Sequence, residues 1–159
     1  MKRKIISTSN LNEARKQIQK ALKENPAEKI ALLSQDDEFN RKTLEIKGLS
    51  MLIINEDLEV KDYSKQRNSG LNEILAKICA DKGTSIGIQI DKIISKNDKE
   101  KAKSLSRLKQ NIMLCKKAGC KIIFLNENNT KLDKRALSSL LLILGASTSQ
   151  AFQAMKNFK

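Results

Sequence analysis

Residues 69–90 carry the pattern that decides the fold class, SGLNEILAKICADKGTSIGIQI. Its first half has apolar residues at the i, i+3, i+4, i+7, i+8 spacing of one helix face: Leu71, Ile74, Leu75, Ile78 and Cys79. Ser69 precedes this run and Gly83 follows it, so the spacing predicts a helix that begins near Ser69 and stops at Gly83. Thr84–Ile90 then reads as a buried strand, because it is nearly continuous in apolar residues.

The same alternation of strand and helix extends over the whole chain. Four further runs predict buried strands: Ile5–Thr8, Lys29–Leu33, Met51–Ile54 and Cys120–Leu125. Cap signals predict the helices between them. Asn10 with Glu13 would form a capping box, Asp36 would open the second helix, and Ser147 with Gln150 would cap the last one. A long helix is expected from about Asn97 to Ala118, where Gly119 stops it, and a leucine-rich helix is expected to end at Gly145. Five strand–helix units require parallel strands and crossovers, so we predict an α/β fold. Residues 1–159 are too few for eight such units, which favours one domain with a shortened, TIM-barrel-like sheet.

Composition excludes several classes of function. The chain contains 31 Lys and Arg against 18 Asp and Glu, a net charge of +13, and it has no histidine. Catalysis that needs a histidine base is therefore excluded, and the commonest metal ligand is missing. Aromatic residues make up 3% of the chain, which weakens any binding mode based on base stacking and leaves phosphate recognition. The three cysteines, Cys79, Cys115 and Cys120, show no metal-binding spacing, and we expect buried thiols in a reducing cytoplasm. No apolar run reaches the length of a membrane span or a secretory leader.

Most of the positive charge lies in the middle of the chain, where residues 61–135 carry a net +10. On a helical wheel of the long helix, one face carries Lys96, Lys99, Lys103, Arg107, Gln110 and Lys117. The opposite face carries Leu105, Leu108, Ile112 and Cys115. This arrangement predicts a helix that packs on the sheet and presents cations to a polyanion, although an ordinary solvated face explains the pattern equally well.

Two loops add to the basic character. The stretch from Asn55 to Ser69 is longer than most connections and carries Lys61, Lys65 and Arg67. Asn68-Ser69-Gly70 would then form an anion site at a helix N-terminus, unless the helix is merely capped there. Lys134-Arg135 opens the leucine-rich helix, where positive charge opposes the helix dipole, and a residue placed against local preference invites a functional explanation.

These residues together resemble a known family. The chain contains the run GLNEILAKI at 70–78, then Ile86-Gly87-Ile88, Arg107-Leu108 with Gln110-Asn111, Lys116-Lys117, and Arg135 ahead of Leu140–Gly145. Together these pieces are similar to the archaeal ribonuclease P protein component 3 family, the thirty-kilodalton subunit type. The similarity covers about residues 29–158. It departs from the family pattern at Glu73, where a histidine is common, and at Lys134-Arg135-Ala136.

The resemblance implies a TIM-barrel-like protein subunit of ribonuclease P, in which RNA supplies the active site for removing the 5′ leader of precursor tRNA. Such proteins look like relatives of PHP phosphoesterases that have lost their metal ligands. The resemblance also implies a small ferredoxin-like partner, protein component 2, and a chain shortened by at least the first strand–helix unit. No cofactor would be bound by the protein, and Mg²⁺ would serve the RNA of the holoenzyme.

Three functions remain open from the sequence. The first is a noncatalytic subunit that binds RNA phosphates without reading bases. Its expected phosphate contacts are Lys65, Arg67, Lys99, Lys103, Arg107, Lys134 and Arg135. The second is a small metal-dependent phosphoesterase of PHP type with Asp36, Asp37 or Asp91 as ligands, although helix capping explains these carboxylates more simply. The third is a general nucleic-acid chaperone.

Overall fold

The computed structural model describes residues 3–156 and 158. Strands and helices alternate along it in the following order: β1 (Arg3–Ile6), α1 (Leu11–Glu24), β2 (Lys29–Leu33), α2 (Asp37–Leu44), β3 (Leu49–Ile54), α3 (Glu73–Lys82), β4 (Ser85–Gln89), α4 (Ile90–Ser95), α5 (Asp98–Ala118), β5 (Ile122–Leu125), α6 (Lys134–Ile143) and α7 (Thr148–Met155).

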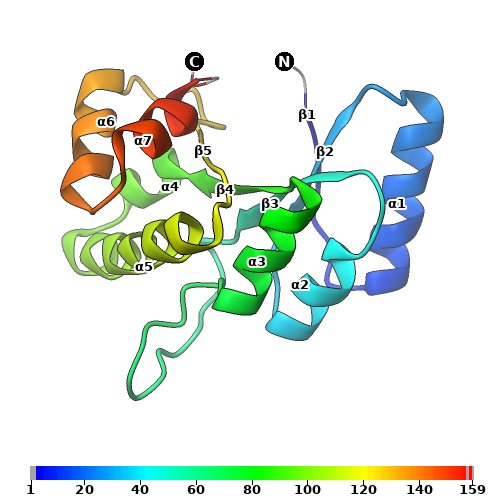
Figure 1. Ribbon diagram of the computed structural model, residues 1–159, viewed down its shortest axis with the longest axis horizontal. Coiled ribbons are helices and arrows are strands. Elements are labelled where there is room, and N and C mark those ends of the chain that lie inside the picture. Colours follow the sequence, from blue (N-terminus) through cyan, green and yellow to red (C-terminus); the bar gives the residue numbers. More distant parts are fainter. Residues whose placement is uncertain (1–2, 157, 159) are drawn as a thin grey trace.

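The five strands form one parallel sheet in the order β1-β2-β3-β4-β5. Because spatial order follows chain order, each crossover advances by one strand, as it does in a parallel barrel. Among the described residues β1 and β5 each pair on one side only, so the sheet stays open (Figure 1). The predicted α/β class and barrel-like sheet are therefore confirmed.

The carboxyl ends of two strands differ from the prediction. β1 runs from Arg3 to Ile6 and not to Thr8, whose hydroxyl donates to Glu13 and accepts from the Asn10 amide. The last predicted residue of the fourth strand, Ile90, begins the short helix α4, which was not predicted from the sequence. An isoleucine-rich turn of helix reads like a strand when it directly follows one.

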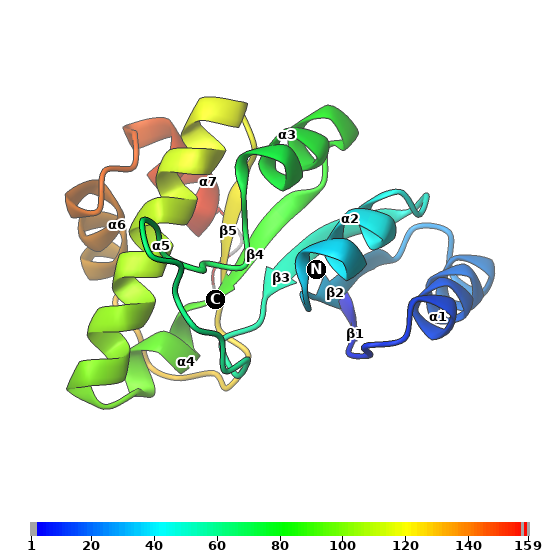
Figure 2. The ribbon, with the colours of Figure 1, turned by 90° about the horizontal axis from the view of Figure 1, so that it is seen from below.

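The two faces of the sheet are covered unequally. Helices lie along one face (Figures 1 and 2), and the main apolar core is packed between them and the sheet. α7 packs against β5 and α6. The other face carries a small separate cluster made by Ala31, Met51, Ile53 and Leu125. We call this second face the open face of the sheet.

Gly87 of β4 lies beneath the cluster on the open face. A Cβ atom at this position would come 2.7 Å from Met51 Sδ and 3.0 Å from Ile53 Cγ1. Those distances are shorter than van der Waals contact, so the absence of a side chain lets the neighbouring strands pack their side chains over β4.

The helix ends agree largely with the cap signals. Asn10, Asp36 and Asn97 cap their helices, and Ser147 forms a full capping box with Gln150. The box predicted for Asn10 forms only in part, because the Glu13 carboxylate accepts from Thr8 and Gln17. The third helix, α3, begins at Glu73 with Asn72 as its cap, whereas the sequence predicted a start near Ser69.

The three cysteines are buried, as predicted, and none of them forms a disulfide. Hydrogen bonding to Cys120 and burial raise the pKa of Cys79 and Cys115, so these two remain neutral thiols. No helix in the described part of the chain is long and apolar enough to cross a membrane.

Candidate nucleic-acid interface

The long connection between β3 and α3, residues 55–72, is held against α5 by Asp62. Arg107 of α5 donates to Asp62 Oδ1 from Nη2 at 2.9 Å and from Nε at 3.2 Å, and it also donates to the Val60 carbonyl at 2.9 Å. Arg67 donates to Asp62 Oδ2 at 2.8 Å, and the Asn68 amide donates to Oδ1 at 2.9 Å. One carboxylate therefore joins two arginines and the loop backbone.

These contacts determine the charge state of Asp62. Desolvation by burial acts to raise its pKa, but the hydrogen bonds from Arg67, Asn68 and Arg107 outweigh that effect and hold the pKa well below its usual value. The carboxylate thus stays ionised at all ordinary pH values. Both arginine charges are partly neutralised within the protein as a result.

Two amides of α5 fix the next part of the loop. Gln110 accepts from the Arg67 amide at 3.1 Å and donates to the Arg67 carbonyl and to Ser69 Oγ, each at 2.9 Å. Asn111, which is buried, donates to the Ser69 carbonyl at 3.1 Å. The residue pair that the family resemblance singled out therefore positions the backbone of this loop.

The start of the same loop is anchored in a similar way. Lys96 donates to Glu56 Oε2 at 2.8 Å, to the Glu56 carbonyl at 3.1 Å and to Ser104 Oγ at 2.9 Å. Further along α5, Lys117 forms an ion pair with Glu73 of α3 at 2.8 Å. The wheel correctly separates the polar and apolar faces of α5. Lys99 and Lys103 are exposed without a partner among the described residues, as expected of a cationic face, whereas Lys96, Arg107, Gln110 and Lys117 bind the 55–72 loop and α3.

Asn68-Ser69-Gly70 does not lie at a helix N-terminus. The Asn68 amide is used by Asp62, and the Ser69 hydroxyl donates to the Leu71 carbonyl at 3.2 Å. The helix begins later, at Glu73, whose carboxylate occupies the first turn. The predicted anion site at these three residues is therefore not formed.

Five of the seven predicted phosphate contacts carry unpaired charge. Their side chains are exposed and form no hydrogen bond or ion pair with other described residues: Lys65, Lys99, Lys103, Lys134 and Arg135. They come from the 55–72 loop, the first turns of α5 and the first turn of α6. The remaining two, Arg67 and Arg107, differ in exposure, with 50% and 17% of the side chain accessible.

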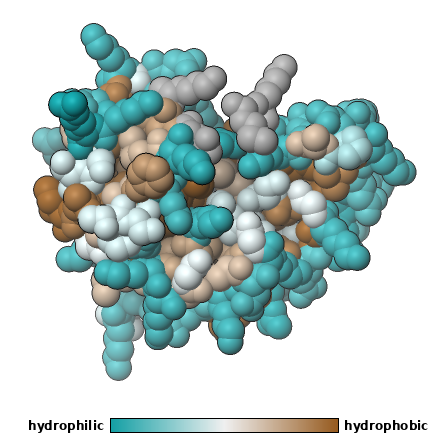
Figure 3. Space-filling view, turned by 45° about the horizontal axis from the view of Figure 1, so that its top comes forward, coloured by the Kyte–Doolittle hydropathy of each residue, from teal (hydrophilic) through white to brown (hydrophobic). Residues whose placement is uncertain are grey.

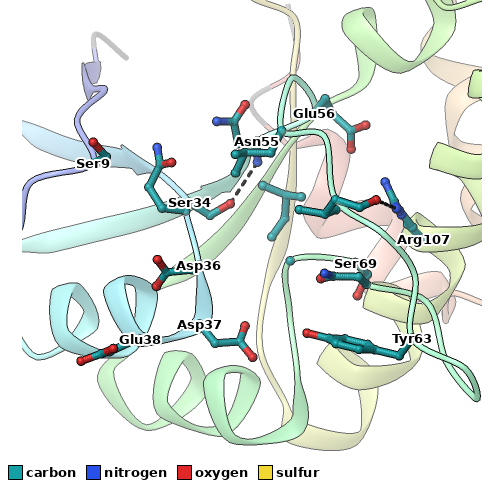
Figure 4. Close-up of a pocket in the computed structure, with 16 residues that line it drawn as sticks. Ser9, Ser34, Asp36, Asp37, Glu38, Asn55, Glu56, Tyr63, Ser69 and Arg107 are labelled. Carbon is teal, nitrogen blue, oxygen red and sulfur yellow. Dashed lines mark hydrogen bonds between the residues drawn. The ribbon is translucent and has the colours of Figure 1, made fainter.

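A cavity of about 550 Å³ lies at the carboxyl ends of β2 and β3 (Figure 4). At its floor, the Asn55 backbone amide donates a hydrogen bond to Ser34 Oγ at 3.0 Å. Acidic residues dominate its charged lining: Asp36, Asp37, Glu38 and Glu56, with Arg107 opposite. This cavity would therefore repel phosphate.

The carboxylates considered as metal ligands have other roles. Asp36 accepts from the Phe39 amide at 2.8 Å, as the capping interpretation predicts, and Asp37 accepts from Asn72. Asp91, which is distant in sequence from Asp36 and Asp37, is buried and accepts hydrogen bonds from the backbone amides of Glu127 and Asn128. Within residues 3–156 and 158, no group of three or more acidic or cysteine side chains is arranged to hold a metal ion.

Asp62 organises the loop, and it is not among the site residues predicted from the sequence. A lone aspartate among Lys61, Lys65 and Arg67 is a usable signal, because a single acid in a basic segment is suited to pair with arginine. Its second partner, Arg107, lies 45 residues away along the chain and could be assigned only from the fold.

No family model matches the chain. Ribonuclease P protein component 3 of Methanosarcina acetivorans is 28% identical over 92 residues, which is 56% of this chain and 38% of that protein. A chain in a cryo-EM structure of archaeal ribonuclease P with mature tRNA superposes with a TM-score of 0.73 at 18% identity, covering 96% of this chain and 63% of that one. A crystal structure of an uncharacterized protein gives a TM-score of 0.56 at 12% identity, covering 91% of this chain and 35% of that one.

This chain thus spans less than two thirds of each of these proteins. At these identities the solved structures establish the fold alone, and the curated relative independently carries the family name that the sequence motifs suggested. The resemblance of this chain to ribonuclease P protein component 3 is therefore confirmed in both sequence and fold.

Proposed function

We propose that the chain is a noncatalytic protein subunit of ribonuclease P that supports the catalytic RNA in 5′ maturation of precursor tRNA. The observation that carries the proposal is the fold match over 96% of the chain to a component of archaeal ribonuclease P, which agrees with the curated relative. The net charge of +13 supports it, because a polyanionic partner compensates such an excess.

RNA would be held through its phosphates. Lys65, Lys99, Lys103, Lys134 and Arg135 supply charges that no described residue neutralises. Arg67 keeps half of its side chain exposed and has further donors for a phosphate beside its contact with Asp62. Arg107 is largely covered and contributes by positioning the loop that carries Lys65 and Arg67. The protein binds no cofactor in this proposal, and Mg²⁺ serves the RNA.

The proposed partners are the ribonuclease P RNA, the precursor tRNA within the complex and the small ferredoxin-like component 2. A protein partner is supported by apolar side chains that project from α6 and α7: Leu142 is 43% exposed, Ile143 80% and Phe152 72%. Figure 3 shows apolar residues at the left edge, over this end of the molecule. The proposed location is the cytoplasm, a reducing compartment that suits three free thiols.

A reconstitution assay tests this function. Precursor tRNA cleavage by the ribonuclease P RNA of M. acetivorans is measured over a range of Mg²⁺ concentrations, with component 2 alone and with component 2 plus this chain. The proposal predicts that adding the chain lowers the Mg²⁺ concentration needed for half-maximal cleavage. An unchanged Mg²⁺ requirement would contradict it, and phosphodiesterase activity of the chain alone with Mn²⁺ would favour the phosphoesterase interpretation.

A further inference from the structure

A second cavity, of about 680 Å³, lies at the amino ends of the strands, on the open face of the sheet. Four cationic residues line it: Arg3, Lys29, Lys82 and Lys121. None of the described residues that line it is acidic. This cavity is separate from the acidic one at the carboxyl ends, and none of its cations belongs to the set predicted from the sequence.

The parallel topology brings these four residues together from distant parts of the chain. Arg3 is the first residue of β1 and Lys29 the first of β2, while Lys121 directly precedes β5 and Lys82 ends the helix before β4. In a parallel sheet all strands begin at the same edge, so one cation near each of four strand starts becomes a cluster. Arg3 and Lys29 are direct partners in the register of β1 and β2.

The charge of this cluster is largely uncompensated. Lys29, Lys82 and Lys121 are exposed and make no side-chain hydrogen bond or ion pair with described residues. Partial burial lowers the pKa of Arg3, and the negative charge of Glu127 acts in the opposite direction, so Glu127 offsets part of the Arg3 charge while the three lysines have no such partner among the described residues. Like charges on adjacent strands destabilise a sheet, so the arrangement costs folding stability that a bound anion would restore.

The cavity also restricts the kind of ligand. An apolar protein surface placed over it would bury lysines without partners, which is unfavourable. A ligand with several negative groups matches the spread of the four cations over neighbouring strands, and the phosphates of a folded RNA provide such a series of charges.

We infer that the cavity at the amino ends of the strands is a second RNA-binding surface, in which Arg3, Lys29, Lys82 and Lys121 contact the phosphate backbone. The inference rests on the proposed function and specifies where the RNA is held. These residues would bind the RNA through its phosphates, and such contacts carry no sequence information by themselves.

Two charge-matched triple variants test the inference. The first, Lys29→Gln/Lys82→Gln/Lys121→Gln, removes three charges from the cavity. The second, Lys16→Gln/Lys77→Gln/Lys116→Gln, removes three exposed, unpaired charges from α1, α3 and α5 on the helix-covered face. Affinity for M. acetivorans ribonuclease P RNA is measured for both variants and the wild type over a series of salt concentrations, with thermal melts to verify folding.

The cavity variant is expected to bind roughly tenfold more weakly at 0.15 M salt, with a salt slope smaller by about two to three, since each lost phosphate contact removes about 0.7–0.9 from the slope. The control variant should stay within about twofold of the wild type. Equal losses in both variants, or no loss in the cavity variant, would overturn the inference and leave the proposed function standing. Failure of the wild type to bind this RNA would overturn the proposed function itself.

Discussion

At the scale of single residues, Asp62 joins the 55–72 loop to α5 through its carboxylate. Its carboxylate accepts from Arg67, Asn68 and Arg107, and its side chain is only 18% exposed. We expect Asp62→Asn to lower the free energy of unfolding at pH 7 by about 1–2 kcal/mol, because charged hydrogen bonds are replaced by weaker ones. Urea denaturation measures this, and Asp81→Asn, at an exposed site, serves as the control.

The same residue gives a pH dependence with a defined sign. The pKa of Asp62 is lowered on folding, so its stabilising effect is present above the unfolded pKa near 4 and is lost as the pH falls below that value. The stability gap between wild type and Asp62→Asn should therefore be constant from pH 5 to 8 and shrink at pH 3. A gap of the same size at pH 3 would show that the ionised carboxylate is not its source.

Gly87 allows a test of packing on the open face. A methyl group there would meet Met51 Sδ and Ile53 Cγ1 at contact distances that side chains do not tolerate. We expect Gly87→Ala to destabilise the protein by about 1–3 kcal/mol, the usual effect of overpacking. Ser85→Ala on the same strand and face, where the hydroxyl has no partner among the described residues, should change the melting temperature little.

At the scale of elements, the strands and most helix ends could be predicted because their signals are local. Continuous apolar runs mark β2 to β5, and Asn97 and Ser147 cap their helices as expected. The partners of the polar face of α5 could not be predicted in this way. A helical wheel shows which side chains share a face, but the segment lying on that face, residues 55–72, is distant in sequence and is placed only by tertiary folding.

Gln110 tests whether α5 orders the loop. It is bonded to both the amide and the carbonyl of Arg67. Gln110→Ala should accelerate amide hydrogen exchange at residues 67–69 while α5 stays protected, because loop contacts are lost and helix hydrogen bonds are not. Lys109→Ala, at an exposed neighbouring position, should leave exchange unchanged. Faster exchange along the whole of α5 would instead indicate that the helix itself had become unstable.

The cations at the strand starts lead to a prediction in which a substitution stabilises the protein. Lys29 lies beside Arg3 in the register of β1 and β2, so removing its charge relieves repulsion. Lys29→Gln should stabilise the free protein by a few tenths of a kcal/mol, within the range of cross-strand charge effects. A rise in melting temperature at low salt that vanishes at high salt is the expected signature. A lower melting temperature would mean that the lysine stabilises the sheet.

At the scale of the whole molecule, the charge distribution was only partly predictable. Segment counts correctly indicated an excess of cations, but they could not separate cations that bind the protein's own loop from those left unpaired. The cluster at the amino ends had a faint signal, one cation close to the start of each of four strands. That signal becomes meaningful only once the strands are known to be parallel and adjacent.

The apolar end of the molecule leads to a prediction about assembly. Ile143 and Phe152 are the most exposed large apolar residues described, at 80% and 72%. If component 2 is the partner, as proposed, Ile143→Asp/Phe152→Asp should weaken its binding by about tenfold or more, because charged residues disfavour an apolar interface core. Calorimetric titration measures this, with an unchanged melting temperature as the check on folding. Undiminished affinity would exclude this end as the partner surface.

The central claim, that the chain is a dedicated ribonuclease P subunit and not a general chaperone, is tested most directly by competition. Labelled M. acetivorans ribonuclease P RNA bound to the chain at 0.15 M salt is challenged with unlabelled copies of itself or with an unrelated structured RNA of equal length. The account predicts that the unrelated RNA competes at least tenfold less effectively. Equal competition by the two RNAs would contradict it.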